Sequence, residues 1–340
     1  MKIDEIFSFE NLYSAHKICR CSKNHKGEVI RFEIDLARNI SKLVKLFKEK
    51  KYKVGKYKCF YIYEPKERKI EALPYKDRVV LQCFCKNSVI PRLDKRLIFD
   101  NIACRKNKGT LFGIKRLKYF LKKEYNERCS NNFYYLKMDI KKYFPNINHN
   151  ILIKKLKKVG FSKDEMWFLE KTLKEQPNKN GVGLPLGNQT SQWFALFYLD
   201  RIDRLIKEKL RIKGYIRYMD DMILIHGDKK YLRMCLENVR KICLEELGLE
   251  LNSKTQIGKV SNGIDFLGFR HIVLENGKVI RKLRSSAKDR MKKHLKNLEK
   301  LKDCKIVDRE YIMIRKNSFK AHLHYSNENI FKRKLDRILK

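Results

Sequence analysis

Three stretches of the chain carry hydrophobic residues at the three- and four-residue spacing of an amphipathic helix. They cover residues 36–51, 188–210 and 286–301. The stripe of the second stretch consists of Ala195, Leu199, Ile202, Ile206 and Leu210. Such a stripe buries one side of a helix, and Asn188 is a residue type that caps helix starts. The pattern therefore predicts one helix over 188–210 and a helical C-terminal region.

Aromatic and β-branched residues gather instead in short runs, which predict strands. The runs are residues 57–63, 69–72, 132–138, 215–219, 222–226, 264–269 and 271–274. Several neighbouring runs are separated by only a few residues, so we expect them to pair as hairpins. Strands in the middle of the chain and helices at its end predict an α+β fold with a helical appendage.

The charge of the chain is strongly positive. Its 340 residues are 43% hydrophobic, which is enough for a folded core. They include 80 Lys and Arg against 39 Asp and Glu, a formal net charge of +41. A compact body with this charge repels itself, and binding to nucleic acid would release counterions. The charge therefore favours a nucleic-acid partner, although a Lys-rich composition alone is a weak indicator.

Ten cysteines occur in a chain that shows no signal-peptide pattern and no stretch apolar enough to cross a bilayer. We therefore expect a cytoplasmic protein with reduced cysteines and no membrane contact. His16, Cys19, Cys21 and His25 are four residues of zinc-binding type close together in sequence. Their spacing matches no common zinc finger, so we favour a loop or a small core patch over a zinc site.

The sharpest chemical signal is a pair of neighbouring carboxylates, Asp220 and Asp221, between two apolar strand-like runs. Like charges a few ångströms apart raise each other's pKa, so such a pair is costly unless a cation is bound. Asp139 follows another predicted strand and is the candidate third carboxylate. Three carboxylates suit two hard divalent ions and in-line nucleotidyl transfer. The alternative is a solvated hairpin turn, since Asp-rich turns are common.

Five motifs in order resemble those of the reverse transcriptase family. They are Lys137 to Ile147, Gly183 to Gln192, the Tyr-Met-Asp-Asp box of residues 218–221, Leu249 to Thr255, and Phe266 to Phe269. One such motif can arise by chance, whereas five in the family's order are specific. The resemblance covers the chain from about Pro74 onward.

The resemblance implies a right-hand polymerase with fingers, palm and helical thumb. The implied division is an N-terminal extension and fingers over residues 1–135, a palm over 136–270 and a thumb over 271–340. The implied reaction is RNA-directed DNA synthesis from dNTPs with two Mg²⁺ ions, which Mn²⁺ can replace. The implied partners are a template RNA or non-coding RNA, a primer and the cDNA product.

The resemblance also implies roles for individual residues. The metal ligands would be Asp139, Ile140, Asp220 and Asp221, with the three aspartates catalytic. The nucleotide-binding residues would be Arg105, Lys108, Phe144, Leu186, Gly187 and Lys254. The primer grip would consist of Phe266, Leu267 and Gly268. In these roles Phe144 excludes a 2′-hydroxyl and Lys254 protonates the leaving pyrophosphate. One of Arg105, Lys106 and Lys108 grips the triphosphate. A core aromatic and a solvated basic loop are the alternatives for Phe144 and for residues 103–110.

Leu186 stands where viral members of the family usually carry Gln. An aliphatic residue there, with Ser191 and Gln192 downstream, resembles the branch found in diversity-generating retroelements. That branch implies low-fidelity copying and a small basic accessory protein. Leu111 departs from the branch, because a His often follows the Gly-Thr pair there. The rival interpretations are an antiviral-defence reverse transcriptase with a dedicated non-coding RNA, and a catalytically silent RNA-binding scaffold.

Overall fold

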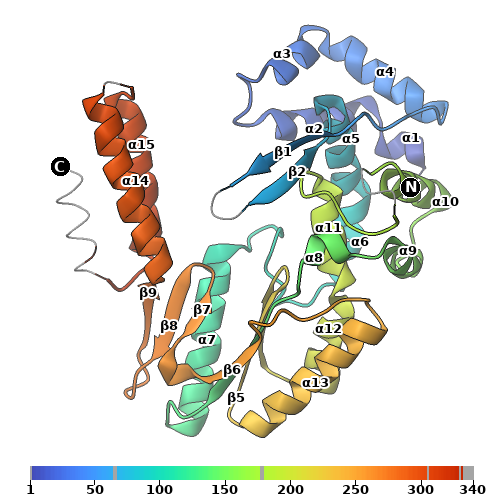
Figure 1. Ribbon diagram of the computed structural model, residues 1–340. Coiled ribbons are helices and arrows are strands. Elements are labelled where there is room, and N and C mark those ends of the chain that lie inside the picture. Colours follow the sequence, from blue (N-terminus) through green and yellow to red (C-terminus); the bar gives the residue numbers. More distant parts are fainter. Residues whose placement is uncertain (1, 64–66, 177–179, 305, 329–330, 332–340) are drawn as a thin grey trace.

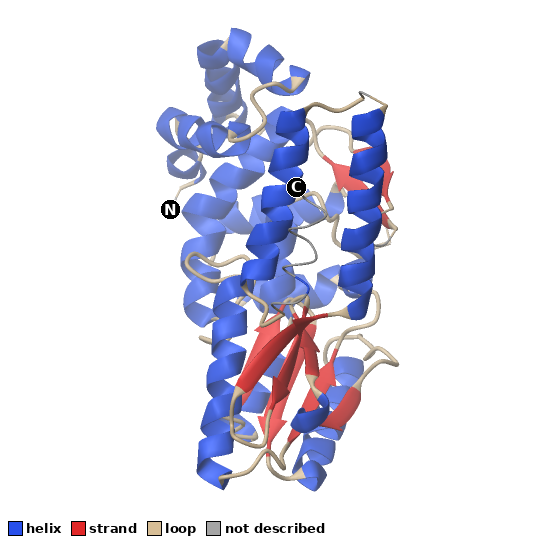
Figure 2. Cartoon of the chain, turned by 90° about the vertical axis from the view of Figure 1, so that its left-hand side faces the viewer, coloured by secondary structure: helices blue, strands red, loops and turns tan. Residues whose placement is uncertain are grey.

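The computed structural model describes residues 2–63, 67–176, 180–304, 306–328 and 331. It shows a mixed helical and sheet protein in which most strands gather in the lower part of the molecule (Figures 1 and 2). Most helices of the N-terminal half form a body above the larger sheets (Figure 1). The α+β fold class predicted from the sequence is confirmed. In the described ranges, no helix has both the length and the apolarity needed to span a bilayer.

The helical body is built from the N-terminal helices and from helices inserted between the strands. Its elements are α1 (Ile3–Ile6), α2 (Phe9–Arg20), α3 (Gly27–Ile34), α4 (Leu36–Lys48), α5 (Tyr75–Phe84), α6 (Ile90–Leu93), α9 (His149–Lys157) and α10 (Lys163–Lys174). A fully buried aromatic cluster joins them, with Phe7 stacked on Phe47 at 3.7 Å and Phe168 edge-on to Phe84 at 4.8 Å. Because these rings come from distant segments, the cluster ties the body together. The predicted helix over 36–51 corresponds to α4.

The central sheet has four antiparallel strands in the order β4-β5-β3-β6. The strands are β3 (Tyr134–Met138), β4 (Gly214–Tyr218), β5 (Asp221–His226) and β6 (Gln256–Lys259). Helices α7 (Thr110–Arg128) and α13 (Lys229–Glu245) contact the sheet. The inner strands β3 and β5 are mostly apolar because they pack into this core.

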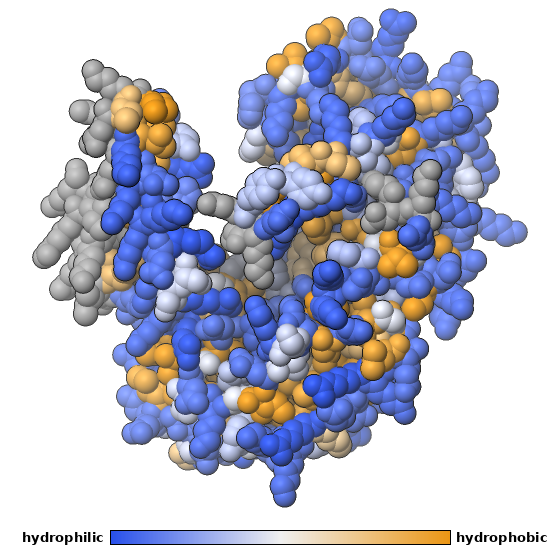
Figure 3. All heavy atoms as spheres, in the orientation of Figure 1, coloured by the Kyte–Doolittle hydropathy of each residue, from blue (hydrophilic) through white to orange (hydrophobic). Residues whose placement is uncertain are grey.

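Two smaller sheets extend the fold. The hairpin of β1 (Lys58–Ile62) and β2 (Arg68–Ala72) projects from the helical body, and its tip at 64–66 lies outside the described residues. The second sheet has the order β7-β8-β9, with β7 (Ile264–Phe266), β8 (Phe269–Val273) and β9 (Val279–Leu283). It leads into α14 (Ser285–Asp303) and α15 (Arg309–His324), which stand apart from the helical body with a hollow between them (Figure 3).

Four details of the structure differ from the sequence-based expectations. The predicted helix over 188–210 is divided into α11 (Gln189–Tyr198), α12 (Asp200–Arg204) and a π-helical turn, η3 (Leu205–Lys209). Asn188 precedes α11 but makes no capping bond: its Nδ2 donates to the Tyr57 hydroxyl at 2.8 Å, and its buried Oδ1 accepts no hydrogen bond. The strand β9 was not predicted, and the expected boundary at 270/271 falls inside β8. The division of the chain into three regions stays a prediction.

Candidate active site at the β4–β5 turn

The connection between β4 and β5 is a two-residue turn of Met219 and Asp220. Tyr218 pairs with Asp221, so Asp221 is the first residue of β5. The sequence had placed it in the turn with Asp220. Met219 has φ +56°, in the left-handed region. Two-residue hairpin turns require positive φ, and a non-glycine residue there is conformationally costly. Contacts elsewhere must therefore hold this turn in place.

Asp139 lies beside the turn because β3 pairs with β5. Met138 is opposite Met222, and the same register carried one step further sets Asp139 opposite Asp221. Directly opposed side chains in an antiparallel pair are about 5 Å apart at their Cβ atoms. The Asn252 Nδ2 donates to Asp139 Oδ2 at 3.3 Å, and the Asn252 amide donates to the Asp139 carbonyl at 2.7 Å. Asn252 therefore fixes both the backbone and the side chain of Asp139.

Placing the three carboxylates close together disfavours their charged forms, and the pKa values of two of them are raised. Burial and the charge of Asp139 raise the pKa of Asp220 to about 6. Burial also raises the pKa of Asp221 to about 6, although the nearby Lys137 opposes the shift, with its Nζ at 3.4 Å from Asp221 Oδ2. The other oxygen, Asp221 Oδ1, is buried without a hydrogen-bond partner. A bound cation would relieve each of these costs.

The donor set suits a hard divalent cation, since carboxylate oxygens are the ligands that Mg²⁺ prefers. Within the described part of the chain, no three His, Cys, Asp or Glu side chains are already gathered in an arrangement for holding a metal. The fit therefore rests on the chemistry of the donors and on the unpartnered Asp221 oxygen. The Ile140 side chain is buried, so this residue can offer an ion only its carbonyl.

We expect the stability of the metal-free protein to depend on these carboxylates. Because their folded pKa values are raised, protonation stabilises the folded state, and this stability is lost as the pH rises through about 6. Urea unfolding in a chelator at about pH 5 and about pH 7.5 measures the effect. Wild type should lose more stability across this range than Asp220→Asn/Asp221→Asn. Equal losses would show that the carboxylates are not electrostatically strained.

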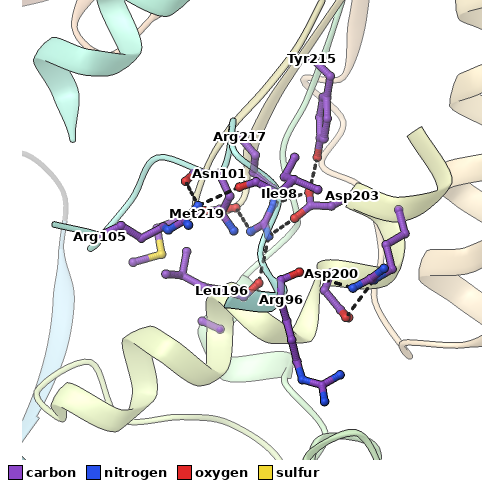
Figure 4. A network of polar contacts seen from close by, with 12 residues as sticks. Arg96, Ile98, Asn101, Arg105, Leu196, Asp200, Asp203, Tyr215, Arg217 and Met219 are labelled. Carbon is purple, nitrogen blue, oxygen red and sulfur yellow. Dashed lines mark hydrogen bonds and ion pairs between the residues drawn. The ribbon is translucent and has the colours of Figure 1, made fainter. Parts of the chain in front are cut away.

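A fully buried arginine holds the turn by hydrogen bonds (Figure 4). Arg217 Nη1 donates to the Met219 carbonyl at 2.9 Å, and Nη2 donates to the Leu196 carbonyl at 2.9 Å. Its guanidinium also binds both oxygens of Asp203, at 2.8 and 2.5 Å. Asp203 accepts a further bond from the Tyr215 hydroxyl at 2.7 Å. The turn is thereby tied to α11 and α12.

Sequence reasoning missed Arg217 and Asp203. A cation in the apolar run of 215–219 and an acid beside the apolar stripe of 188–210 were the available signals. Charged residues are fully buried almost only when they are paired. The two positions are 14 residues apart, so each segment alone gave no sign of its partner.

Arg105 and Lys108, the predicted triphosphate residues, differ from each other in their contacts. Arg105 is committed to its own loop, with its Nε bonded to Asp94 at 2.5 Å and its Nη1 bonded to the Ile98 and Asn101 carbonyls. Lys108 donates to the Phe99 carbonyl, and its Nζ lies 4.3 Å from the centre of the Phe99 ring. Burial, with Arg105 nearby, lowers the pKa of Lys108 to about 8. Only Lys108 keeps donors that a ligand can compete for easily.

The predicted residues Phe144 and Leu186 lie in neighbouring segments. Phe144 belongs to the short helix α8 (Tyr143–Asn146), and its carbonyl accepts the Leu184 amide at 2.9 Å. This bond brings the loop of Leu186 alongside α8. Both Phe144 and Leu186 are half-buried, so each presents part of its side chain to the surface.

Gly187 allows its loop to approach strand β2. A Cβ there would lie 2.4 Å from the Glu71 carbonyl oxygen, which no real side chain tolerates. We expect Gly187→Ala to destabilise the protein by about 1–3 kcal/mol, because the loop or β2 must shift. Urea unfolding checks this, with Gly27→Ala as control, since a Cβ at Gly27 would meet Arg31 at an ordinary 3.5 Å. Equal stabilities would contradict the close approach.

The remaining predicted residues lie on two loops. Lys254 is exposed in the segment that Asn252 organises, and its amide donates to Asn252 Oδ1 at 3.1 Å. Leu267 and Gly268 form the β7–β8 turn, with φ +48° and +89°, while Phe266 is fully buried. The turn packs against α7, where a Cβ on Gly113 would meet Leu267 at 2.6 Å.

Two of the four residues of zinc-binding type have other contacts. His16 is buried, with Nδ1 at 2.9 Å from the Tyr75 hydroxyl and Nε2 at 3.2 Å from Glu33. The Cys19 thiol donates to the Arg78 carbonyl at 3.6 Å, whereas Cys21 is exposed. His16 and Cys19 thus contribute to the packing of α2, as the favoured interpretation had it.

Comparison with known proteins identifies the family. The family described as "Reverse transcriptase (RNA-dependent DNA polymerase)" matches residues 80–271, more than half of the chain. Among solved structures, apo telomerase from Candida tropicalis, truncated from its C-terminal domain, has a TM-score of 0.51 and 16% identity, covering 67% of this chain and 55% of the telomerase. Candida tropicalis telomerase with a fragment of telomeric RNA also has a TM-score of 0.51 and 16% identity, with coverage of 68% and 45%.

At this identity the telomerase structures show a shared fold, and the chain spans about half of their length. No curated protein matches the chain. The family match and the shared fold agree with the order of motifs around Asp139 and the β4–β5 turn. The chain belongs to the reverse transcriptase family.

Proposed function

We propose that the chain is an RNA-directed DNA polymerase whose reaction centre is formed by Asp139, Asp220 and Asp221. The observation that carries the proposal is the convergence of three carboxylates at the ends of adjacent strands. Two of them have pKa values raised to about 6, and one has an unpartnered oxygen. Such groups are expected where a protein is prepared for a charged ligand rather than for maximal stability.

Reverse transcriptases use divalent metal ions, and we propose two Mg²⁺ here, with Mn²⁺ able to replace them. When bound, the ions supply activation of the primer 3′-hydroxyl and neutralisation of the triphosphate. The three aspartates hold the ions, and the Ile140 carbonyl is an additional oxygen donor. Asn252 orients Asp139, while Lys137 stays bonded to Asp221 and limits its movement. The chain's contribution is to keep these oxygens fixed before substrate arrives.

The dNTP would lie between the aspartates and the segments of Phe144 and Lys108. Phe144 is proposed to pack under the sugar and exclude a 2′-hydroxyl. Lys108 is proposed to contact the triphosphate, because its ammonium can exchange the Phe99 carbonyl for a phosphate oxygen. Arg105 instead holds the loop that carries Lys108. Leu186, Gly187 and Lys254 are proposed to lie near the nucleotide, with Lys254 donating a proton to pyrophosphate.

Template RNA and primer are proposed to occupy the hollow between the helical body and the C-terminal helices (Figure 3). Phe266, Leu267 and Gly268 would position the primer end, because their hairpin links the central sheet to α14. The C-terminal helices would hold the duplex through its phosphates, since α14 is rich in lysine. A net charge of +41 supports a polyanionic partner.

We propose a diversity-generating retroelement as the biological setting, on the motif resemblance around Leu186. A small basic accessory protein would belong to that setting. The rival is an antiviral-defence enzyme with a dedicated non-coding RNA. A neighbouring variable-repeat gene would support the retroelement, and a structured RNA beside the gene would support defence.

Leu186→Gln is expected to reduce errors opposite template adenines by about an order of magnitude, if the missing Gln contact loosens template geometry. Sequencing cDNA made by wild type and variant on one RNA measures the error spectrum. Leu186→Met is the control, because it conserves volume without adding an amide. Equal adenine misincorporation in Leu186→Gln and wild type would rule out this origin of the errors.

A silent RNA-binding scaffold is the alternative from another class. It predicts RNA binding without incorporation of labelled dNTPs in the presence of Mg²⁺ or Mn²⁺. The proposed polymerase predicts incorporation that a chelator abolishes. Measuring RNA binding by gel shift and incorporation on the same preparation separates the two.

A further inference from the structure

A basic groove lies between α7 and the segment that leads from η3 into β4. Its lining includes the cationic side chains of Arg116, Lys123, Lys207, Arg211 and Lys213, together with Tyr119. None of its eight lining residues is acidic. We call this feature the α7 groove. Its concentration of like charges requires an explanation, because like charges on neighbouring elements repel each other.

Part of the charge is neutralised at the floor of the groove. Arg116 Nε lies 2.6 Å from Asp100 Oδ1, and Lys207 Nζ lies 3.3 Å from Asp100 Oδ2. One buried carboxylate thus serves two cations. For Arg211 and Lys213 the structure shows no acidic partner within the described residues, and both are exposed. The rim of the groove therefore retains positive charge available to an anionic ligand.

An aromatic ring stands over this charge. The Tyr119 side chain is 50% exposed, and the Arg116 guanidinium lies 4.8 Å from the centre of its ring. An exposed tyrosine alone is ordinary, and so is a basic surface on this chain. A half-exposed ring in a groove whose rim carries unpaired cations, however, matches the elements that bind single strands, in which bases stack on rings and phosphates follow the cations.

The groove is distinct from the proposed reaction centre. Lys213 precedes β4 and Met219 follows it. Six residues of extended chain separate these positions by about 20 Å. A ligand in the groove would therefore not occupy the place of the dNTP.

We propose that the α7 groove binds a single-stranded segment of the RNA partner. The groove lies outside the hollow between the helical body and the C-terminal helices, which we call the catalytic hollow. The proposal rests on the proposed function for the identity of the nucleic acid as RNA. A single strand is favoured over a duplex, because only unpaired bases can stack on Tyr119. The groove would hold the RNA while another segment of it is copied.

Fluorescence anisotropy with the full chain tests the groove. The probe is a labelled uridine-rich RNA of about 12 nucleotides, added after the catalytic hollow is filled with an unlabelled, chain-terminated primer–template. The groove variant is Tyr119→Ala/Arg211→Glu/Lys213→Glu. The control is Tyr13→Ala/Arg38→Glu/Lys48→Glu, which makes the same chemical changes on exposed residues of α2 and α4.

The groove variant is expected to bind the RNA at least about 30-fold more weakly. The slope of log affinity against log salt concentration should fall in magnitude by about 1.4, the value for two lost phosphate contacts. The control should stay within about threefold of wild type. Equal binding by both variants would overturn the proposal, and so would tighter binding of the corresponding DNA. Extension of a preannealed primer should persist in the groove variant. The two proposals can fail separately. If the wild-type protein does not extend primers, but the groove variant alone loses RNA binding, the proposed function is wrong and the groove proposal is supported.

Discussion

Asp220→Asn/Asp221→Asn is expected to reduce primer extension by about 10⁴-fold or more, while the protein stays folded. The substitution keeps the shape of both side chains and removes the charges that hold divalent ions. Because the two carboxylates have raised pKa values in the folded protein, their neutralisation should also stabilise the metal-free state. Steady-state extension assays and urea unfolding measure the two effects.

The matched control is Asp4→Asn/Asp35→Asn, which removes the same charge from exposed positions. It should leave extension within about twofold of wild type. Template–primer binding should persist in the Asp220→Asn/Asp221→Asn variant, since the duplex is held mainly through its phosphates. Retained extension in that variant would remove the turn from the reaction centre.

Arg217→Met is expected to destabilise the protein by about 3–5 kcal/mol, because it leaves the buried Asp203 carboxylate unpaired. Loss of stability alone would not distinguish support of the fold from support of the turn. Arg217→Met/Asp203→Leu/Tyr215→Phe removes the whole buried network and leaves no orphaned charge or hydroxyl. Replacing buried ion pairs by apolar residues is often neutral for stability, so this variant should recover most of the loss.

The triple variant should still extend primers about 100-fold more slowly than wild type, because the Met219 carbonyl has lost the donor that holds the turn. The effect is expected in kcat, with the KM for template–primer unchanged and the half-maximal Mg²⁺ concentration raised. Wild-type kcat in a stable triple variant would show that Arg217 serves the fold alone.

Local patterns predicted much of the fold. The strands β3, β4 and β5 and the helix α4 follow from runs of residues whose spacing is legible within each segment. The neighbouring carboxylates Asp220 and Asp221, between two apolar runs, indicated a cation site from sequence alone. The pairing of β3 with β5, which brings Asp139 to the turn, was not predicted, because spacing within one segment does not show which strands pair.

The features that sequence missed depend on distant contacts. Asn188 was expected to cap a helix, but its side chain donates to the distant Tyr57 and accepts no bond from the helix. Arg105 was expected to face the triphosphate, but Asp94 and two carbonyls bind its guanidinium. Arg217 was missed because its role depends on Asp203, Leu196 and Met219 together. A single side chain can satisfy several partners, and the sequence does not reveal which of them prevails.

The measurement that tests the central claim most directly is extension of a DNA primer annealed to a defined RNA by the purified protein. The reaction contains dNTPs and Mg²⁺, and flanking RNA from the native locus is added in a parallel sample. The account predicts cDNA whose sequence complements the RNA, whose synthesis stops in chelator, and which Asp220→Asn/Asp221→Asn does not produce. RNA binding without any metal-dependent cDNA, in both samples, would contradict it.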